Sequence, residues 1–383
     1  MLKLSISKET EEFRGNFRSW LETHPPPKVS GADSSTEAFV RVGRAWQATL
    51  ASGNWVGCHW PAQFGGRGLS LVEEAIVQEE LVRVGAPQLL GLFGITMVGP
   101  VLIKHGSDLQ KQRFLANILS GKEIWCQGFS EPGAGSDLAA VKTRARMGAD
   151  GFILSGQKVW TSFAQVADYC FVLCRTSDEP KKHQGLTYLL VDMRASGIST
   201  KPLKQITGDD EFNEVFFDEV FVPQSNLVGK VGQGWEIAIS TLMYERVVLT
   251  FARQIQSEVL LRNLVNKHRD DKRAWVQKEL AERTAEACAL RALAYEHLLS
   301  YAGGQAPGPE GSLDKLFWSE SYQSICKLAL KLNGSLGALS EGAQEAGADV
   351  FRYLYSRGRS IAAGSSEIQR NIIAERILGL PRG

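Results

Sequence analysis

A glycine- and serine-rich stretch at residues 127–137, Gln-Gly-Phe-Ser-Glu-Pro-Gly-Ala-Gly-Ser-Asp, is the segment best suited to hold a bound group. Gly133 and Gly135 let the backbone turn tightly and present N–H groups, while Ser130 and Ser136 add hydroxyl donors. Such a loop can surround phosphates or carbonyls, although a Gly/Ser loop alone is more often a simple turn. It is not the Gly-x-Gly-x-x-Gly that opens a helix in nicotinamide-binding proteins, so that class is disfavoured.

A second stretch at residues 156–162, Gly-Gln-Lys-Val-Trp-Thr-Ser, follows soon after. By itself it predicts a strand with a buried tryptophan. Beside the first stretch it has another meaning, because a planar indole (Trp160) with adjacent hydroxyls (Thr161, Ser162) suits the face and edge of an isoalloxazine ring.

The elements that must position these residues change twice along the chain. Apolar residues recur at helical spacing up to about residue 122, for example between Leu71 and Leu81. Short β-rich runs then follow, separated by Gly, Pro, Asp and Ser clusters, at 152–154, 169–174, 186–193 and 215–222. The sequence therefore predicts an N-terminal helical domain at 1–122 and a middle antiparallel β domain at 123–231.

The remaining residues, 232–383, predict a C-terminal helical domain. We expect one Gly/Pro-rich interruption, at 303–311, between two long helices. In the final helix Ser366 and Gln369 have the spacing of a capping box, and Gly379 with Pro381 marks the end.

Composition narrows the class of protein. Of 383 residues 44% are hydrophobic, and the formal charge of +1 gives no broad attraction to nucleic acid. No apolar run has the length of a membrane span, and the N-terminal residues lack the apolar centre of a signal peptide, so we expect a cytoplasmic protein. Histidines without ligand spacing and cysteines without a Cys-x-x-Cys pair predict no metal site, and Cys170 and Cys174 are expected to be buried thiols.

Taken together, these segments resemble the acyl-CoA dehydrogenase family over essentially the whole chain. Residues 217–223, 232–235 and 364–370 (Gly-Ser-Ser-Glu-Ile-Gln-Arg) carry the resemblance further. It implies a mainly α fold with a central β domain and a C-terminal four-helix bundle, FAD as cofactor and a tetrameric enzyme of lipid metabolism. The implied reaction desaturates an acyl-CoA thioester between its α and β carbons, as in fatty-acid β-oxidation.

The resemblance also implies the residues of the site. Those expected to bind FAD are Gln127, Phe129, Ser130, Gly135, Ser136, Trp160, Ser162, Ser365 and Glu367. Ser136 is also expected to contact the acyl-CoA, with Tyr244 and Arg246 as substrate neighbours. An arginine for the FAD pyrophosphate should lie near 267–273, and the choice between Arg269 and Arg273 stays open.

The reaction needs a base that removes the α proton while a hydride leaves the β carbon for flavin N5, and a desolvated glutamate suits that role. In the family this glutamate occupies one of two positions. The later position is Ala363 here, which cannot act as a base, and the earlier one is Glu245. The resemblance therefore implies Glu245 as the base, in the arrangement of isovaleryl, long-chain and some steroid-side-chain enzymes.

Two alternatives remain at this point. The chain could be a flavin oxidase or monooxygenase of the same fold, or one subunit of a hetero-oligomeric dehydrogenase rather than of a homotetramer. An electron-transferring flavoprotein is the expected acceptor. The acyl group stays open, although the small Ala363 favours a branched, long or ring-bearing one.

Overall fold

The computed structural model describes residues 7–27, 36–305, 308–335 and 344–381, and the side chains at 36, 245–250 and 344–346 lie outside that description. By contacts the chain divides into two units, each taking segments that are distant in sequence. Unit 1 comprises residues 1–20, 70–85 and 246–383, and unit 2 comprises residues 21–69 and 86–245.

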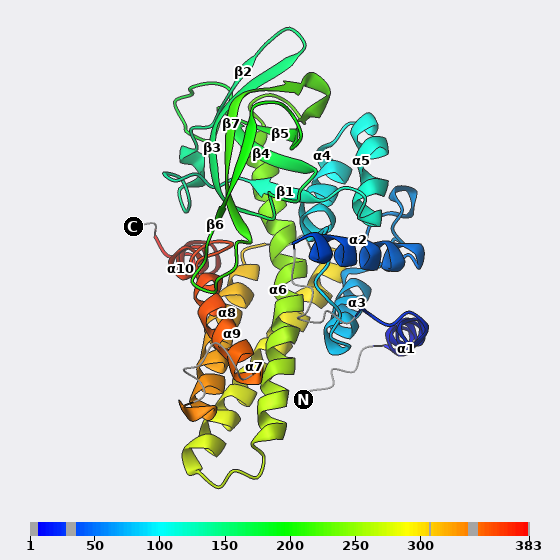
Figure 1. Cartoon of the computed structure of the whole chain (residues 1–383), viewed down its shortest axis with the longest axis vertical. Helices are drawn as coiled ribbons and strands as arrows, with labels where there is room; N and C mark the ends of the chain where they lie inside the picture. Colours follow the sequence, from blue (N-terminus) through cyan, green and yellow to red (C-terminus); the bar gives the residue numbers. More distant parts are fainter. Residues whose placement is uncertain (1–6, 28–35, 306–307, 336–343, 382–383) are drawn as a thin grey trace. The chain divides into compact units, whose positions relative to one another are not determined.

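Unit 2 contains the β-sheet. Its strands are β1 (Trp125–Gly128), β2 (Arg144–Met147), β3 (Gly151–Ser162), β4 (Tyr169–Arg175), β5 (Leu186–Asp192), β6 (Ile198–Leu203), β7 (Phe212–Pro223) and β8 (Leu227–Val228). They run in the order β6-β7-β3-β2-β4-β5-β8, with β1 beside β4 (Figure 1). The four predicted strands are all present. Most pairs are antiparallel, as expected, and β1 and β2 each also meet β4 in parallel.

The strands of this sheet differ in how deeply they are buried. β4 and β5 consist of nearly continuous apolar residues and are buried on both faces, as expected of interior strands. The longer β3 and β7 pair over most of their length and carry both buried and exposed positions. Cys170 and Cys174 are both buried in the sheet core, and both are free thiols.

Helices of unit 2 cover one end of the sheet. They include α2 (Thr36–Ser52), α4 (Gly99–His105) and α5 (Asp108–Ser120), with short turns at η1 (Ala62–Phe64) and η2 (Gly94–Val98). Ser107 and Gln110 form a capping box that starts α5. Phe114 on α5 packs edge-on against Trp125 of β1 at 5.2 Å between ring centroids. This packing fixes β1, the strand that leads into the Gly/Ser loop.

Unit 1 is helical. Besides α3 (Leu71–Arg83) and part of α1 (Lys8–Thr23), it holds the C-terminal part of α6 (Gly234–Lys267), then α7 (Ala274–Ala302), α8 (Gly311–Leu332), α9 (Gln344–Arg359), α10 (Ser366–Ile372) and a final π-turn, η6 (Ile373–Ile377). Helices α8 and α9 lie side by side (Figure 1). Leu264 on α6, Leu280 on α7 and Leu328 on α8 share one core, as a bundle requires.

A buried ion cluster joins the separate segments of unit 1. Arg14 on α1 and Arg291 on α7 donate to opposite oxygens of Glu79 on α3, at 2.9 and 3.0 Å. Arg291 also bonds Glu258 on α6 at 2.6 Å. Burial alone would raise the pKa of Glu79, but Arg291 and Arg14 hold it at about 2. Glu79 is therefore ionised at neutral pH, and its pairing helps to bring the segments together.

Two boundary predictions need correction. Ser365, not Ser366, is the N-cap of α10: its hydroxyl accepts the Ile368 N–H at 3.4 Å, while Ser366 is buried in the first turn. Helix α7 ends at Ala302 and α8 begins at Gly311, as expected, but a further break separates α6 from α7 at 268–273, where there is neither Gly nor Pro. Gly379, with φ of 67°, follows the last turn as expected.

Candidate active site

The Gly/Ser loop leaves the sheet at the end of β1. Glu131 and Ala134 exchange two backbone hydrogen bonds of 3.0 Å, which makes the loop tight. Phe129 is buried, whereas Gly135 and Ser136 are exposed. A Cβ placed on Gly135 would have no protein atom within 4 Å. The protein's own packing therefore does not require glycine here, and the open space leaves room for a bound group.

A buried ion pair between Lys158 and Glu131 stabilises this loop. Lys158 on β3 is 0% exposed, and its Nζ donates to Glu131 Oε1 and Leu173 O at 2.7 Å and to Phe129 O at 3.0 Å. The second Glu131 oxygen accepts the Lys142 N–H at 2.6 Å. Burial raises the pKa of Glu131, but Lys158 and these donors outweigh it and hold the pKa below its usual value. Glu131 is thus structural, and Lys158 is a residue that motif reasoning missed.

Trp160 occupies an unusual backbone conformation at the end of β3. Its φ is 59°, in the left-handed region that residues with a large side chain rarely adopt, and the pairing of β3 with β7 shifts register between Lys158 and Thr161. The indole is 60% exposed and meets Phe212 edge-on at 6.0 Å. A strained backbone that presents a large aromatic face to solvent is typical of a binding site.

The structure brings the two motifs together. The Val159 N–H donates to Ser130 O at 2.9 Å, so the Gly/Ser loop lies beside the strand that carries Trp160. Ser162 is buried at the end of β3, and Thr161 has a buried hydroxyl oxygen without a hydrogen-bond partner. Gln127, Phe129, Ser130, Gly135, Ser136, Trp160 and Ser162 thus all lie in unit 2, on β1, the loop after it and the end of β3.

Ser365 and Glu367 lie in unit 1, at the start of α10. Glu367 is exposed, and backbone N–H donation followed by the Ser365 hydroxyl lowers the pKa of its carboxyl. Ala363, which precedes them, has φ of 57°, and its assignment to the later base position stays a prediction.

The predicted base lies on α6. Tyr244 is half-buried, and burial raises the pKa of its phenol. The backbone of Glu245 and Arg246 is helical, but their side chains lie outside the described residues. Glu245 therefore stays a prediction. The division between the two units falls between these two residues.

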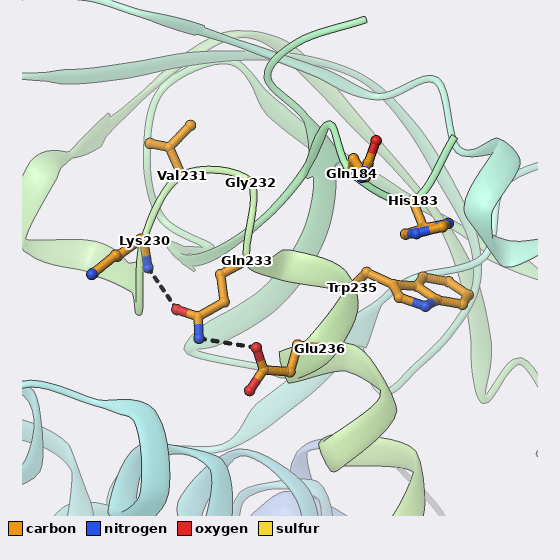
Figure 2. Close-up of a pocket in the computed structure, with 8 residues that line it drawn as sticks. All are labelled: His183, Gln184, Lys230, Val231, Gly232, Gln233, Trp235 and Glu236. Atoms are coloured by element: carbon orange, nitrogen blue, oxygen red, sulfur yellow. Dashed lines mark hydrogen bonds between the residues drawn. The ribbon is translucent and has the colours of Figure 1, made fainter. Parts of the chain in front are cut away.

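A shallow cavity of about 430 Å³ in unit 2 was not predicted. It is lined by His183 and Gln184 from the turn before β5 and by residues 230–233, Trp235 and Glu236 around the start of α6 (Figure 2). The His183 and Trp235 rings are 6.1 Å apart, tilted by 37°. Gln233 accepts from the Lys230 N–H and donates to Glu236, each at 3.2 Å. Residues 232–235 carry part of the family resemblance, but the cavity itself was not predicted, because it forms only when two loops meet.

The two arginines expected near 267–273 differ in their contacts. Arg273 donates to both carboxylate oxygens of Asp271, and its guanidinium lies over Trp275 at 5.1 Å. Arg269 is exposed. The choice between them stays a prediction.

Within the described part of the chain, no group of three His, Cys, Asp or Glu side chains could hold a metal ion. Among its helices none has both the length and the apolar character needed to cross a bilayer.

Known proteins are similar to this chain over nearly its whole length. Models of the acyl-CoA dehydrogenase N-terminal, middle and C-terminal domains match residues 7–122, 126–220 and 232–378. The acyl-CoA dehydrogenase IpdE1 of Mycobacterium tuberculosis is 40% identical, covering 98% of this chain and 99% of the relative. IpdE1 of Mycolicibacterium smegmatis is 39% identical, covering 98% of each.

Solved structures agree. The Tcur3481-Tcur3483 steroid ACAD has a TM-score of 0.87 at 28% identity, and the ChsE4-ChsE5 complex from Mycobacterium tuberculosis has 0.86 at 31%, each covering 100% of both chains. The expected three-domain fold is confirmed. The chain belongs to the acyl-CoA dehydrogenase family of flavin-dependent oxidoreductases.

Proposed function

We propose that this chain binds FAD and removes the α and β hydrogens of an acyl-CoA thioester, with Glu245 as the base. The observation that carries the proposal is the position of Trp160, an exposed indole on a strained backbone beside a loop braced by the Lys158–Glu131 pair. Strain of this kind persists only where the surrounding structure holds it, and it clusters at ligand sites.

The residues present fit FAD. Ser130, Ser136 and Ser162 offer hydroxyl donors, the loop around Gly135 leaves open space, and the Thr161 hydroxyl is buried without a partner. When bound, FAD supplies the acceptor for the β hydride. The chain's own part is to hold the ring against the Trp160 indole and to keep the loop fixed. We keep 1–122, 123–231 and 232–383 as the proposed domain division.

The chain supplies one candidate base. Glu245 lies one helical residue after the half-buried Tyr244, and Ala363 leaves the family's other position without a carboxylate. Near desolvating neighbours a glutamate has a raised pKa, which suits a base that takes a proton from carbon. Tyr244 and Arg246 would then lie beside the substrate.

The cavity of Figure 2 suits the polar end of the acyl-CoA. Lys182, next to His183, bonds Asp137 at 3.0 Å, which ties the cavity rim to the loop that carries Ser136. Two aromatic rings and Lys230 at the rim offer stacking and positive charge to a phosphorylated nucleotide.

For the acyl group we propose a bulky, ring-bearing one. The small Ala363 leaves room, and the Tcur3481-Tcur3483 relative is described as a steroid ACAD. Because that relative and ChsE4-ChsE5 are complexes of two chains, assembly with a related chain is as suitable as a homotetramer. Electron-transferring flavoprotein is kept as the proposed acceptor.

The test is an anaerobic titration of the purified protein, followed by its visible spectrum. Short, long, branched and steroid-side-chain acyl-CoAs are added in turn. Bleaching of the oxidised flavin band by ring-bearing thioesters supports the full proposal, and bleaching by another class corrects only the acyl group. A bound flavin that no acyl-CoA reduces, with or without a co-expressed relative, points to oxidase or monooxygenase chemistry. A protein that takes up no FAD overturns the proposal.

A further inference from the structure

The turn between α9 and α10 has an unusual backbone. Ala363 has φ of 57° and Gly364 has φ of 91°, and the Ser366 N–H donates to Ser360 O at 2.9 Å across the turn. A non-glycine residue in the left-handed region costs on the order of 1 kcal/mol or more. Contacts around this turn must therefore stabilise it.

A buried ammonium supplies one of those contacts. Lys315 on α8 is 1% exposed, and its Nζ donates to Gly364 O at 2.6 Å. Gln369 Nε2 donates to the same oxygen at 3.1 Å and to Ala363 O at 3.0 Å. Two buried donors on one carbonyl oxygen therefore fix the backbone immediately before Ser365.

Other residues of α8 hold the same connection. Gln323 Nε2 donates to Ser356 O at 3.1 Å and to Ser360 Oγ at 3.0 Å, near the end of α9. Glu320 pairs with Arg370 of α10, and both side chains are about half-exposed. Lys315, together with the buried Gln369, holds the end of the turn that leads directly to Ser365 and Glu367.

We propose that Lys315 is a positioning residue for the cofactor: by holding the Gly364 carbonyl it fixes the backbone from which Ser365 and Glu367 bind FAD. This inference rests on the proposed function. The buried ammonium of Lys315 then serves cofactor binding and also joins α8 to the turn. Ser365 already caps α10, so a shift of the preceding carbonyl would move both the cap and the exposed Glu367.

The experiment compares Lys315→Met and Lys315→Arg with Glu320→Gln. Glu320→Gln is the matched control, because it removes the exposed ion pair between α8 and α10. FAD affinity of each apoprotein is measured by quenching of flavin fluorescence, at a temperature where circular dichroism shows every variant folded. Thermal unfolding of the apoproteins is measured separately. We expect Lys315→Met to weaken FAD binding at least tenfold, Lys315→Arg to recover part of that loss, and Glu320→Gln to stay within twofold of the wild type.

Each other outcome has a definite meaning. If Lys315→Met lowers the unfolding temperature of the apoprotein but binds FAD as tightly as the wild type, Lys315 is a structural tie and the inference is overturned. If Lys315→Met does not fold, Lys315→Gln decides by the same tenfold criterion. Failure of the wild type itself to bind FAD overturns the proposed function, which is a separate result.

Discussion

Lys158 Nζ lies 2.7 Å from Glu131 Oε1, and both side chains are almost completely buried beneath the Gly/Ser loop. We expect Lys158→Met to lower the free energy of unfolding by roughly 3–5 kcal/mol, because it leaves the Glu131 carboxylate buried without its cation. Urea unfolding measures the change. Lys182–Asp137 is the matched exposed pair, and Asp137→Asn should change stability by less than about 1 kcal/mol. Equal effects of the two variants would contradict the role of burial.

The double variant Lys158→Met with Glu131→Leu sharpens this prediction. Removing both charges should recover part of the stability that Lys158→Met loses, since no unpaired carboxylate remains. FAD affinity should stay low, because Glu131 also accepts the Lys142 and Thr143 N–H groups that hold the loop. Recovered FAD binding in the double variant would show that the loop does not need these bonds.

Trp160→Gly should separate stability from binding. Glycine adopts φ of 59° without strain, which offsets the loss of a mostly exposed indole, so the free energy of unfolding should stay within about 1 kcal/mol of the wild type. FAD affinity should fall clearly. Phe221→Ala, which removes another exposed aromatic side chain of the sheet, should leave FAD affinity unchanged. A large loss of stability in Trp160→Gly would contradict the account of a strained residue kept for binding.

Glu245→Gln should lower the rate of flavin reduction by acyl-CoA by about 10²–10⁴-fold, the usual contribution of a general base. FAD content and acyl-CoA binding should be retained, and stopped-flow absorbance measures the rate. Glu282→Gln, on the exposed side of α7, is the control. Adding Ala363→Glu to Glu245→Ala should restore part of the rate by moving the carboxylate to the other position. An unchanged rate in Glu245→Gln would exclude this residue as the base.

The His297–Asp314 pair predicts a pH dependence of stability. His297 Nδ1 lies 2.8 Å from Asp314 Oδ2, and this bond raises the pKa of the imidazole above its usual value of 6.5, against the effect of burial. A raised folded-state pKa means that the stabilisation is fully present below pH 6.5 and is lost as pH rises through the raised pKa. His297→Gln should remove this slope from a plot of unfolding free energy against pH. A wild-type curve that rises over the same range would contradict the prediction.

The sequence predicted the fold well because the signals that mark its strands and loops are local. Alternation and apolar runs predicted β4 and β5, which are buried on both faces, and glycines marked the loop after β1. The break between α6 and α7 was missed because residues 268–273 contain charges but no Gly or Pro. There Asp271 accepts the Arg273 backbone N–H and its guanidinium, which makes a turn without the usual turn residues.

Contacts between distant residues could not be predicted in this way. Lys158 appears in a strand motif as an ordinary charged residue, and only the fold places it under Glu131, Phe129 and Leu173. Lys315 likewise has no local signal, since its partner, Gly364, lies on another segment. Such residues become recognisable only when the partners that compensate their burial are known.

The ion cluster of Arg14, Glu79 and Arg291 has a consequence for synthesis of the protein on the ribosome. Glu79 emerges early, close in the sequence to Arg14 and Arg83, but Arg291, a further cation that pairs with it, is made more than two hundred residues later. Until then the carboxylate that the finished protein buries lacks the cation supplied by α7. The N-terminal helices therefore cannot complete their packing during translation, and the nascent chain depends on its last third, or on a chaperone that shields it, to reach the native state.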